Sequence, residues 1–168
     1  MKKYELLLDD TITIRGGVKL YRIKACKAFS SGDKTVNIGD LGGYVKSEDN
    51  LSHDGNSWIY DEAKVYGDAC VFGDASVYGY AEVYGDAWIH DYAKVLSNAK
   101  IYEDAEVCGK AQVFGNARVY GQAQVYDHAK VYGDARVYDN ARVFGKAKVH
   151  GNAKVYYDDT KVSGVYLI

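Results

Sequence analysis

The feature that most constrains this chain is a period of six residues. From Ile59 to Val155 an aliphatic residue, always Val or Ile, recurs every six positions, seventeen times. Two residues before these positions, from Ala63 to Ala153, stands an alanine, sixteen times without exception. The position after the aliphatic residue is Tyr ten times and Phe three times, and Gly, Asp, Asn or Lys mostly follow. The repeated phrase is A-x-V-Y-G-D, and a fixed period of this kind predicts a repeat architecture.

The phrase predicts short β-strands joined by tight corners. Alternation of Ala, a variable residue, Val and Tyr places Ala and Val on one face of a short strand. The Gly-Asp pair makes a corner, because Gly, Asn and Asp tolerate positive φ. A strand this short cannot bury its apolar face alone, so successive coils must stack. The absence of proline leaves every interior N–H free for the ladder between coils. We therefore predict a parallel β-helix.

The repeat resembles that of the hexapeptide-repeat proteins, which have an aliphatic residue every six positions and a small residue at the fifth place. This resemblance implies an all-β fold: a left-handed parallel β-helix, triangular in section, with three hexads per turn. The seventeen hexads would then make between five and six turns, roughly 27 Å tall at the ~4.8 Å strand spacing. An 18-residue turn also sorts the positions after the aliphatic residues into three columns. One column is all tyrosine: Tyr66, Tyr84, Tyr102, Tyr120, Tyr138 and Tyr156.

The two ends of the chain lack the strict repeat. Residues 1–50 are predicted to form a β cap over the open end of the solenoid, which would block edge-to-edge growth. Apolar runs on either side of Gly16 and Gly17 predict a β-hairpin within this cap. The hexapeptide β-helix is assigned to residues 51–157. Residues 158–168, a short acidic segment and an apolar strand, are predicted to cap the last coil or to pair with another chain.

The segment before the repeats carries a more specific resemblance. It reads GDLGGYV and, after a short gap, NLSHDGNSWIYDEAKV. Uncharacterised bacterial and prophage-borne hexapeptide-repeat proteins have a similar GG-aromatic-V, NLS-x-x-G and SW-I-Y-D-x-A sequence there, and the resemblance covers nearly the whole chain. Members are labelled acyltransferases or polymer-forming proteins on the basis of their fold. Because a fold does not imply a function, the site has to be assessed separately.

The enzyme alternative comes from the resemblance of the coil to hexapeptide acyltransferases, which use acetyl-CoA at a cleft between subunits. They have a histidine base, a loop that projects from the prism and often a C-terminal helix. Here no insertion interrupts the repeat, and no C-terminal helix is predicted. Structural roles explain the histidines better: His53 lies before the repeats, His90 and His150 replace aromatic residues, and His128 occupies a corner. We assign no catalytic residue and no cofactor.

Metal binding is not predicted. His90 and His128 would lie two turns apart, about 10 Å by the strand spacing, whereas zinc ligands lie within ~2.1 Å of the ion. Cys70 and Cys108 are also separated by two turns, and the three cysteines show no CxxC spacing. This cysteine usage indicates reduced thiols in a cytoplasmic protein. No apolar run in the sequence approaches the ~20 residues that span a bilayer, so no membrane association is predicted. The start of the chain, MKKYELLLDDT, does not resemble a secretory signal.

The tyrosine column is the best candidate for function. Stacked aromatics on neighbouring strands contribute a few tenths to ~1 kcal/mol each, and a contiguous apolar patch of this size also favours a contact surface. We keep both interpretations. Arginines stand two residues before two of the tyrosines, and Tyr and Arg are enriched at protein interfaces. The predicted interaction surface is Tyr66, Tyr84, Tyr102, Tyr120, Tyr138, Tyr156, Arg118 and Arg136.

The small net charge of −2 conceals an asymmetry. Residues 59–107 contain ten acidic and three basic side chains (net −7), and residues 108–155 contain three acidic and eight basic ones (net +5). Antiparallel pairing would set the acidic half of each copy beside the basic half of the other. Single-stranded nucleic acid could follow basic residues interleaved with aromatics, but the acidic half disfavours it. We predict a non-catalytic solenoid that binds a protein, itself as a dimer or trimer, or both; the prophage resemblance implies a host protein.

Overall fold

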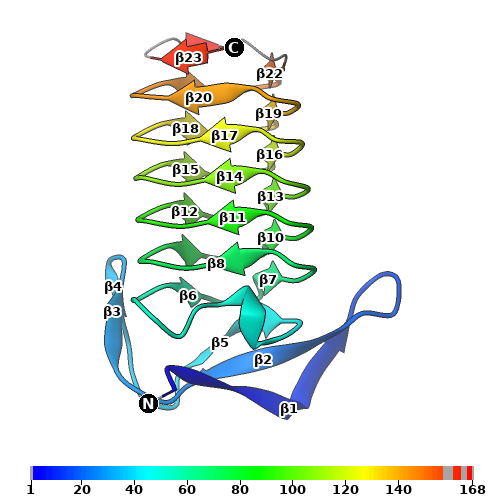
Figure 1. Ribbon diagram of the computed structural model, residues 1–168, viewed down its shortest axis with the longest axis vertical. Coiled ribbons are helices and arrows are strands. Elements are labelled where there is room, and N and C mark those ends of the chain that lie inside the picture. Colours follow the sequence, from blue (N-terminus) through cyan, green and yellow to red (C-terminus); the bar gives the residue numbers. More distant parts are fainter. Residues whose placement is uncertain (1, 157–160, 164–165, 168) are drawn as a thin grey trace.

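The computed structural model of the chain describes residues 2–156, 161–163 and 166–167. Parallel coils are stacked along one axis into a three-sided solenoid, with the N-terminal strands at one end (Figure 1). Six coil strands follow one another on one face, which counts six turns. The predicted all-β, parallel β-helix is therefore confirmed. The left-handed sense of the winding rests on the resemblance to hexapeptide-repeat proteins.

Each face of the solenoid is one parallel sheet. Glu82 pairs with Lys64 on one side and with Lys100 on the other, so a turn contains 18 residues or three hexads. We call the first face the tyrosine face; its coil strands are β7 (Lys64–Val65), β10 (Glu82–Val83), β13 (Lys100–Ile101), β16 (Arg118–Val119), β19 (Arg136–Val137) and β22 (Lys154–Val155). The second face consists of β8 (Cys70–Val71), β11 (Trp88–Ile89), β14 (Glu106–Val107), β17 (Gln124–Val125), β20 (Arg142–Phe144) and β23 (Lys161–Ser163). The third consists of β6 (Trp58–Ile59), β9 (Ser76–Val77), β12 (Lys94–Val95), β15 (Gln112–Val113), β18 (Lys130–Val131), β21 (Lys148–Val149) and β24 (Tyr166–Leu167).

The strands are shorter than the four-residue phrase predicts, since most contain two residues. From Ile59 to Val149 the chain turns at the second residue after each aliphatic position, which has a positive φ; Gly67, for example, has a φ of 71°. The hydrogen-bond ladder nevertheless continues past the strand ends, because Tyr66 N donates to Val83 O at 3.0 Å and Asp68 N donates to Gly85 O at 2.8 Å. Among the residues that the structure describes, six other than glycine hold this positive φ: Asp61, Asp91, Ser97, Glu103, Asp127 and Asp139.

The core is a single column along the solenoid axis. The repeated alanines and aliphatic residues from Ala63 to Val149 are at most 1% exposed. Valines fill the interior of each coil, and alanines occupy the inward positions beside the corners. The repeated phrase is therefore a packing rule, and only the variable, aromatic and corner positions reach the surface.

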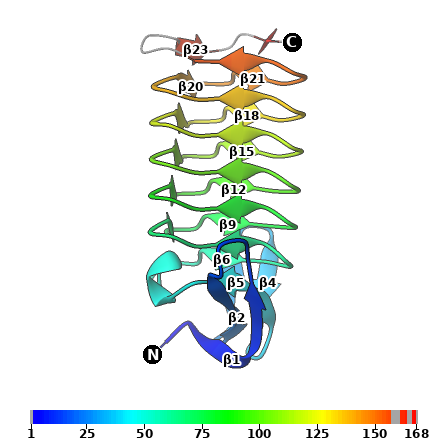
Figure 2. The same cartoon turned by 90° about the vertical axis from the view of Figure 1, so that its right-hand side faces the viewer.

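The N-terminal cap extends the sheet of the tyrosine face. Strands β1 (Tyr4–Thr13) and β2 (Lys19–Ala25) form the predicted antiparallel hairpin, with Gly16 and Gly17 at φ values of 88° and 78° in its turn. Strand β2 then pairs antiparallel with β5 (Leu41–Val45), and β5 pairs parallel with β7 of the first coil. The cap therefore replaces a missing coil beneath the first turn (Figure 2).

A second hairpin, which the sequence did not predict, stands along the third face (Figure 1). Its strands are β3 (Phe29–Ser31) and β4 (Lys34–Val36). The hydroxyl of Tyr60 donates to the Ser31 carbonyl at 3.0 Å, and the Lys34 ammonium lies over the ring of Tyr78 at 5.2 Å. This hairpin covers the first turns of the third face.

The remaining described elements are a short helix and two late strands. The helix is the 3₁₀ turn η1 (Glu48–Asn50), so no described helix has the length or apolarity to cross a bilayer. In the predicted C-terminal segment, β23 pairs with β20 and β24 pairs with β21, both in parallel. Residues 157–160, 164–165 and 168, which include parts of that segment, lie outside the described residues.

Candidate interaction surface

The six tyrosines of the predicted surface form one continuous stack on the tyrosine face. From Tyr66 to Tyr156, consecutive ring centroids are 4.8–5.1 Å apart and the ring planes agree within 8°. The strand spacing sets this distance. Each ring covers its neighbours and stays partly exposed. Burial raises the pKa of the Tyr84 and Tyr102 hydroxyls further above the already high value of tyrosine, and both are hydrogen-bond donors at neutral pH.

A row of charged side chains runs beside this stack. In chain order its members are Lys64, Glu82, Lys100, Arg118, Arg136 and Lys154. Glu82 lies 3.4 Å from the Lys100 ammonium and accepts from the Tyr66 hydroxyl at 3.4 Å. Arg118 and Arg136 are exposed. Within the described part of the chain, neither of these two arginines has an ion pair or a hydrogen bond through its guanidinium.

The other two faces do not offer a comparable ladder. On the second face Phe72 stacks on His90, but Cys108 interrupts the column before the next aromatic pair. On the third face Leu96 interrupts the corresponding column of rings. The β3–β4 hairpin covers Tyr60 and Tyr78, the two rings that precede Leu96 in that column. Within the described residues, the predicted surface is therefore the one column of rings that runs unbroken through all six turns.

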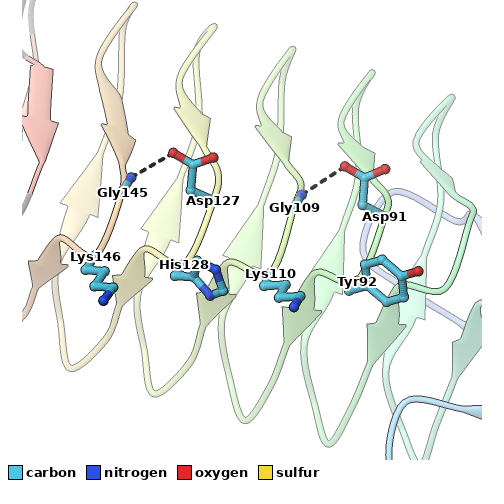
Figure 3. A pocket seen from close by; sticks show the side chains of 8 residues that line it. All are labelled: Asp91, Tyr92, Gly109, Lys110, Asp127, His128, Gly145 and Lys146. Atoms are coloured by element: carbon cyan, nitrogen blue, oxygen red, sulfur yellow. Dashed lines mark hydrogen bonds between the residues drawn. The ribbon is translucent and has the colours of Figure 1, made fainter.

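A shallow groove of about 470 Å³ follows the corner between the second and third faces. Side chains from four successive turns lie in a row along it: Tyr92, Lys110, His128 and Lys146 (Figure 3). Two carboxylates tie the turns together beside this row. Asp91 accepts from Gly109 N and Asp127 accepts from Gly145 N, both at 3.0 Å. One side of the groove thus carries the basic side chains Lys110, His128 and Lys146, which occupy equivalent corner positions in successive turns.

Comparison with known proteins identifies the repeat. Residues 111–127 and 135–151 both match the family of the YdcK β-solenoid repeat. The chain is a β-solenoid repeat protein. The comparison with curated proteins gave no match. The family match therefore describes the repeat unit, and the solenoid's function has to be argued from its surface.

Three of the solenoid's four histidines have structural surroundings. His53 stacks on Tyr4 with a centroid distance of 4.3 Å and lies 3.3 Å from a Glu48 carboxylate oxygen. His150 stacks on Tyr132 at 5.1 Å, as the ring that it replaces would do. His128 occupies the corner row that the sequence predicted, in line with two lysines.

The fourth histidine belongs to a cluster that the sequence analysis missed. Nε2 of His90 donates to Glu106 at 2.9 Å, and Cys108 follows His90 in the same column one turn later. Burial, together with the Glu106 carboxylate, raises the pKa of the Cys108 thiol to about 11. The histidine pair His90 and His128 and the cysteine pair Cys70 and Cys108 are each two turns apart, so neither pair predicts the cluster. The 18-residue spacing could have predicted the cluster, since it places His90 next to Cys108 in one column.

Proposed function

We propose that this solenoid is a non-catalytic binding scaffold that pairs with a second copy of itself through the tyrosine face. The observation that carries the proposal is the unbroken tyrosine ladder beside the unpaired guanidinium groups of Arg118 and Arg136. Tyrosine and arginine supply much of the binding energy of protein interfaces, because they combine a large contact area with hydrogen-bond donors.

The spacing of the ladder favours another solenoid as the occupant. Rings repeat every 4.8–5.1 Å along a flat face, and the neighbouring charges repeat with the same turn. A second copy presents its own tyrosine stack and charged row at the same spacing. Every turn of one tyrosine face, here called a rung, can therefore contact a rung of the other copy at the same time. A helical or irregular partner would match this period at isolated points only, since its side chains follow other repeats.

The charges favour an antiparallel arrangement. A two-fold axis that lies in the interface, perpendicular to the solenoid axis, makes each column face itself in reverse order. Centred between the third and fourth rungs, it sets Tyr102 against Tyr120 and Arg136 against Glu82. It also sets the acidic half, residues 59–107, beside the basic half, residues 108–155. Two of the three kinds of contact in this row are unfavourable, because Arg118 meets Lys100 and Lys154 meets Lys64.

Sedimentation velocity over a concentration series at low salt tests the pairing. We expect a concentration-dependent dimer that Tyr102→Glu or Tyr120→Glu abolishes, because each places a carboxylate at the centre of both copies' ladders. The matched control is Tyr126→Glu, the same change on the second face, which should leave the dimer intact. A chain that stays monomeric at high concentration and low salt would overturn the proposal.

Charge exchange tests the orientation. Arg136→Glu should weaken the dimer, because it sets two carboxylates against each other where Arg136 faces Glu82. Adding Glu82→Arg to the same chain should restore it, since the two-fold axis brings the exchanged pair together again. Lys100→Glu should tighten the dimer by removing the contact with Arg118. If the double exchange is no better than Arg136→Glu alone, this arrangement is wrong.

The resemblance to prophage-borne proteins makes a host protein the competing occupant of the same face. A monomeric chain that binds such a protein, with binding lost in Tyr102→Glu and kept in Tyr126→Glu, would replace self-pairing by recognition of a foreign partner. That outcome would contradict the second copy as occupant and leave the tyrosine face as the binding surface.

A further inference from the structure

On the second face, two departures from the aromatic rule lie directly above one another. His90 stacks on Phe72 at 4.8 Å, and the next rung of that column is Cys108. Glu106 stands two residues before Cys108 on strand β14, and its Oε1 lies 2.9 Å from Nε2 of His90. The imidazole, carboxylate and thiol ligand atoms of His90, Glu106 and Cys108 all lie within 4.8 Å of one another.

Further polar groups hold two of these three side chains in place. Asp91 Oδ1 lies 3.4 Å from Nδ1 of His90, while Oδ2 of the same carboxylate accepts from Gly109 N at 3.0 Å. Gln124 donates to the second oxygen of Glu106 at 2.8 Å. A carboxylate behind an imidazole and a hydrogen bond behind a carboxylate are the outer contacts that orient metal ligands.

We propose that His90, Glu106 and Cys108 bind a zinc ion, with the fourth coordination position open to water. Zinc takes imidazole nitrogen, carboxylate oxygen and thiolate sulfur at ~2.0–2.3 Å, and three protein ligands with one open position are a common arrangement for it. A thiolate beside an imidazole also selects zinc over magnesium or calcium, which prefer oxygen ligands alone.

The geometry requires side-chain adjustment only. Ligand atoms around a tetrahedral zinc lie about 3.3–3.6 Å apart, by the bond lengths given above. The His90–Glu106 contact therefore opens from 2.9 Å and the thiol moves inward, while the ladder keeps the backbone register. The His90 side chain is 17% exposed and that of Glu106 31%, so an ion can reach the site from solvent.

Cobalt(II) is the probe for this site, because its bond to a thiolate gives a sulfur-to-metal charge-transfer band. The reduced protein, stripped of metal, is titrated with cobalt chloride and then with zinc. We expect one equivalent of cobalt to bind with this band, and one equivalent of zinc to displace it. Native mass spectrometry of the whole chain gives the zinc stoichiometry independently.

Variants of the cluster have matched controls elsewhere in the solenoid. Cys108→Ser should remove the charge-transfer band, and His90→Phe should weaken zinc binding at least tenfold while continuing the aromatic stack. Cys70→Ser and His150→Phe are the same changes at other positions, and they should leave the charge-transfer band and the zinc affinity unchanged. Asp91→Asn, behind the His90 ring, should weaken binding by about 10- to 100-fold.

Two results would overturn the zinc site. One is the absence of a thiolate band in the unmodified chain, which would leave His90 and Glu106 as a plain ion pair. The other is equal zinc affinity in the unmodified chain and in a correctly folded Cys108→Ser or His90→Phe variant, which would place the metal elsewhere. Circular dichroism of each variant establishes the fold, and none of these measurements depends on pairing of the tyrosine faces.

Discussion

Single residues at the corners carry the strictest local demands of this fold. Asp127 has a φ of 59°, and its side chain accepts from Gly145 N in the next turn at 3.0 Å. Asp127→Ala loses this hydrogen bond, worth ~0.5–1.5 kcal/mol, and places a residue that avoids positive φ at a cost of ~1–2 kcal/mol. Asp127→Gly loses the same bond without the positive-φ cost, and it also makes the unfolded chain more flexible, at a cost of about 0.4–1 kcal/mol. We expect urea unfolding to show the larger loss of stability for alanine; equal losses would contradict a role for the backbone conformation.

Lys3 is a buried charge at the base of the solenoid. Its side chain is fully buried, and its Nζ donates to the carbonyl of Ser57 at 2.9 Å and to the hydroxyl at 3.2 Å. Burial, and secondarily the charge of Lys27, lowers its pKa from 10.5 to about 8. The folded chain therefore holds this proton less tightly than the unfolded chain does.

This lowered pKa predicts a pH dependence of stability. Between about pH 8 and pH 10.5 the unfolded chain binds more protons at Lys3, so this residue's contribution to the free energy of unfolding rises with pH. Lys3→Met keeps most of the apolar stem and should remove that rise. Urea unfolding at pH 7.5 and pH 9.5 compares the two chains. An identical pH dependence in both would show that Lys3 is not the group responsible.

At the scale of elements, one arginine joins the cap to the first coil. The Arg22 guanidinium lies over the Tyr44 ring at 4.3 Å, donates to Glu62 at 2.9 Å and has its Nε 3.0 Å from Asp10. The Nε–Asp10 contact is an ion pair without hydrogen-bond alignment, since Nε lacks a hydrogen-bond partner within the described residues. The Arg22 side chain is 15% exposed, and its loss leaves the Asp10 carboxylate of the cap and the Glu62 carboxylate of the first coil without this cation.

Removing this arginine should loosen the cap. We expect Arg22→Ala to lower the free energy of unfolding by about 1–3 kcal/mol, the range for a partly buried group bonded to charged partners. Hydrogen exchange should show the loss mainly in β1 and β2. Lys24→Ala removes an exposed pair with Glu5 and is the control, expected to change stability by less than ~0.5 kcal/mol. A similar effect of both changes would argue against Arg22 as the joint.

The elements also show how far the sequence determines the structure. The period of the repeat, with the three hexads per turn that the resemblance implies, predicts that residues 18 apart in the coils are neighbours, and this pairing holds from β7 to β22. Strand β23 pairs with β20 at an offset of 19 residues instead. Gly16-Gly17 predicts the first hairpin. The β3–β4 hairpin escaped prediction because contacts to the third face hold it, including a hydrogen bond from Tyr60 to Ser31. The His90–Glu106–Cys108 cluster combines different residue types from two turns, so no short sequence motif predicts it.

In the whole molecule, the residues that specify the fold are different from the residues that form the surface features. Alanine and valine specify the coil at each turn, and the remaining positions are free to form a tyrosine ladder on one face and a His-Glu-Cys cluster on another. Because each coil contacts its neighbours only, stability should grow nearly in proportion to the number of turns. The length of the solenoid can then change without a change of fold, provided that the columns are kept.

Deletions of two lengths test this independence of turns. Removing residues 111–128 takes out one full turn and joins Lys110 to Ala129, so every later side chain keeps its face. We expect a cooperatively folded chain that has lost part of its unfolding free energy. Removing residues 111–119 takes out half as many residues but sets Tyr120 at an inward alanine position and Val125 at a corner. By far-UV circular dichroism and limited proteolysis, this shorter deletion should be the more damaging one, with the coils after the junction unfolded. If the full-turn deletion proves equally damaging, the coils form one indivisible unit.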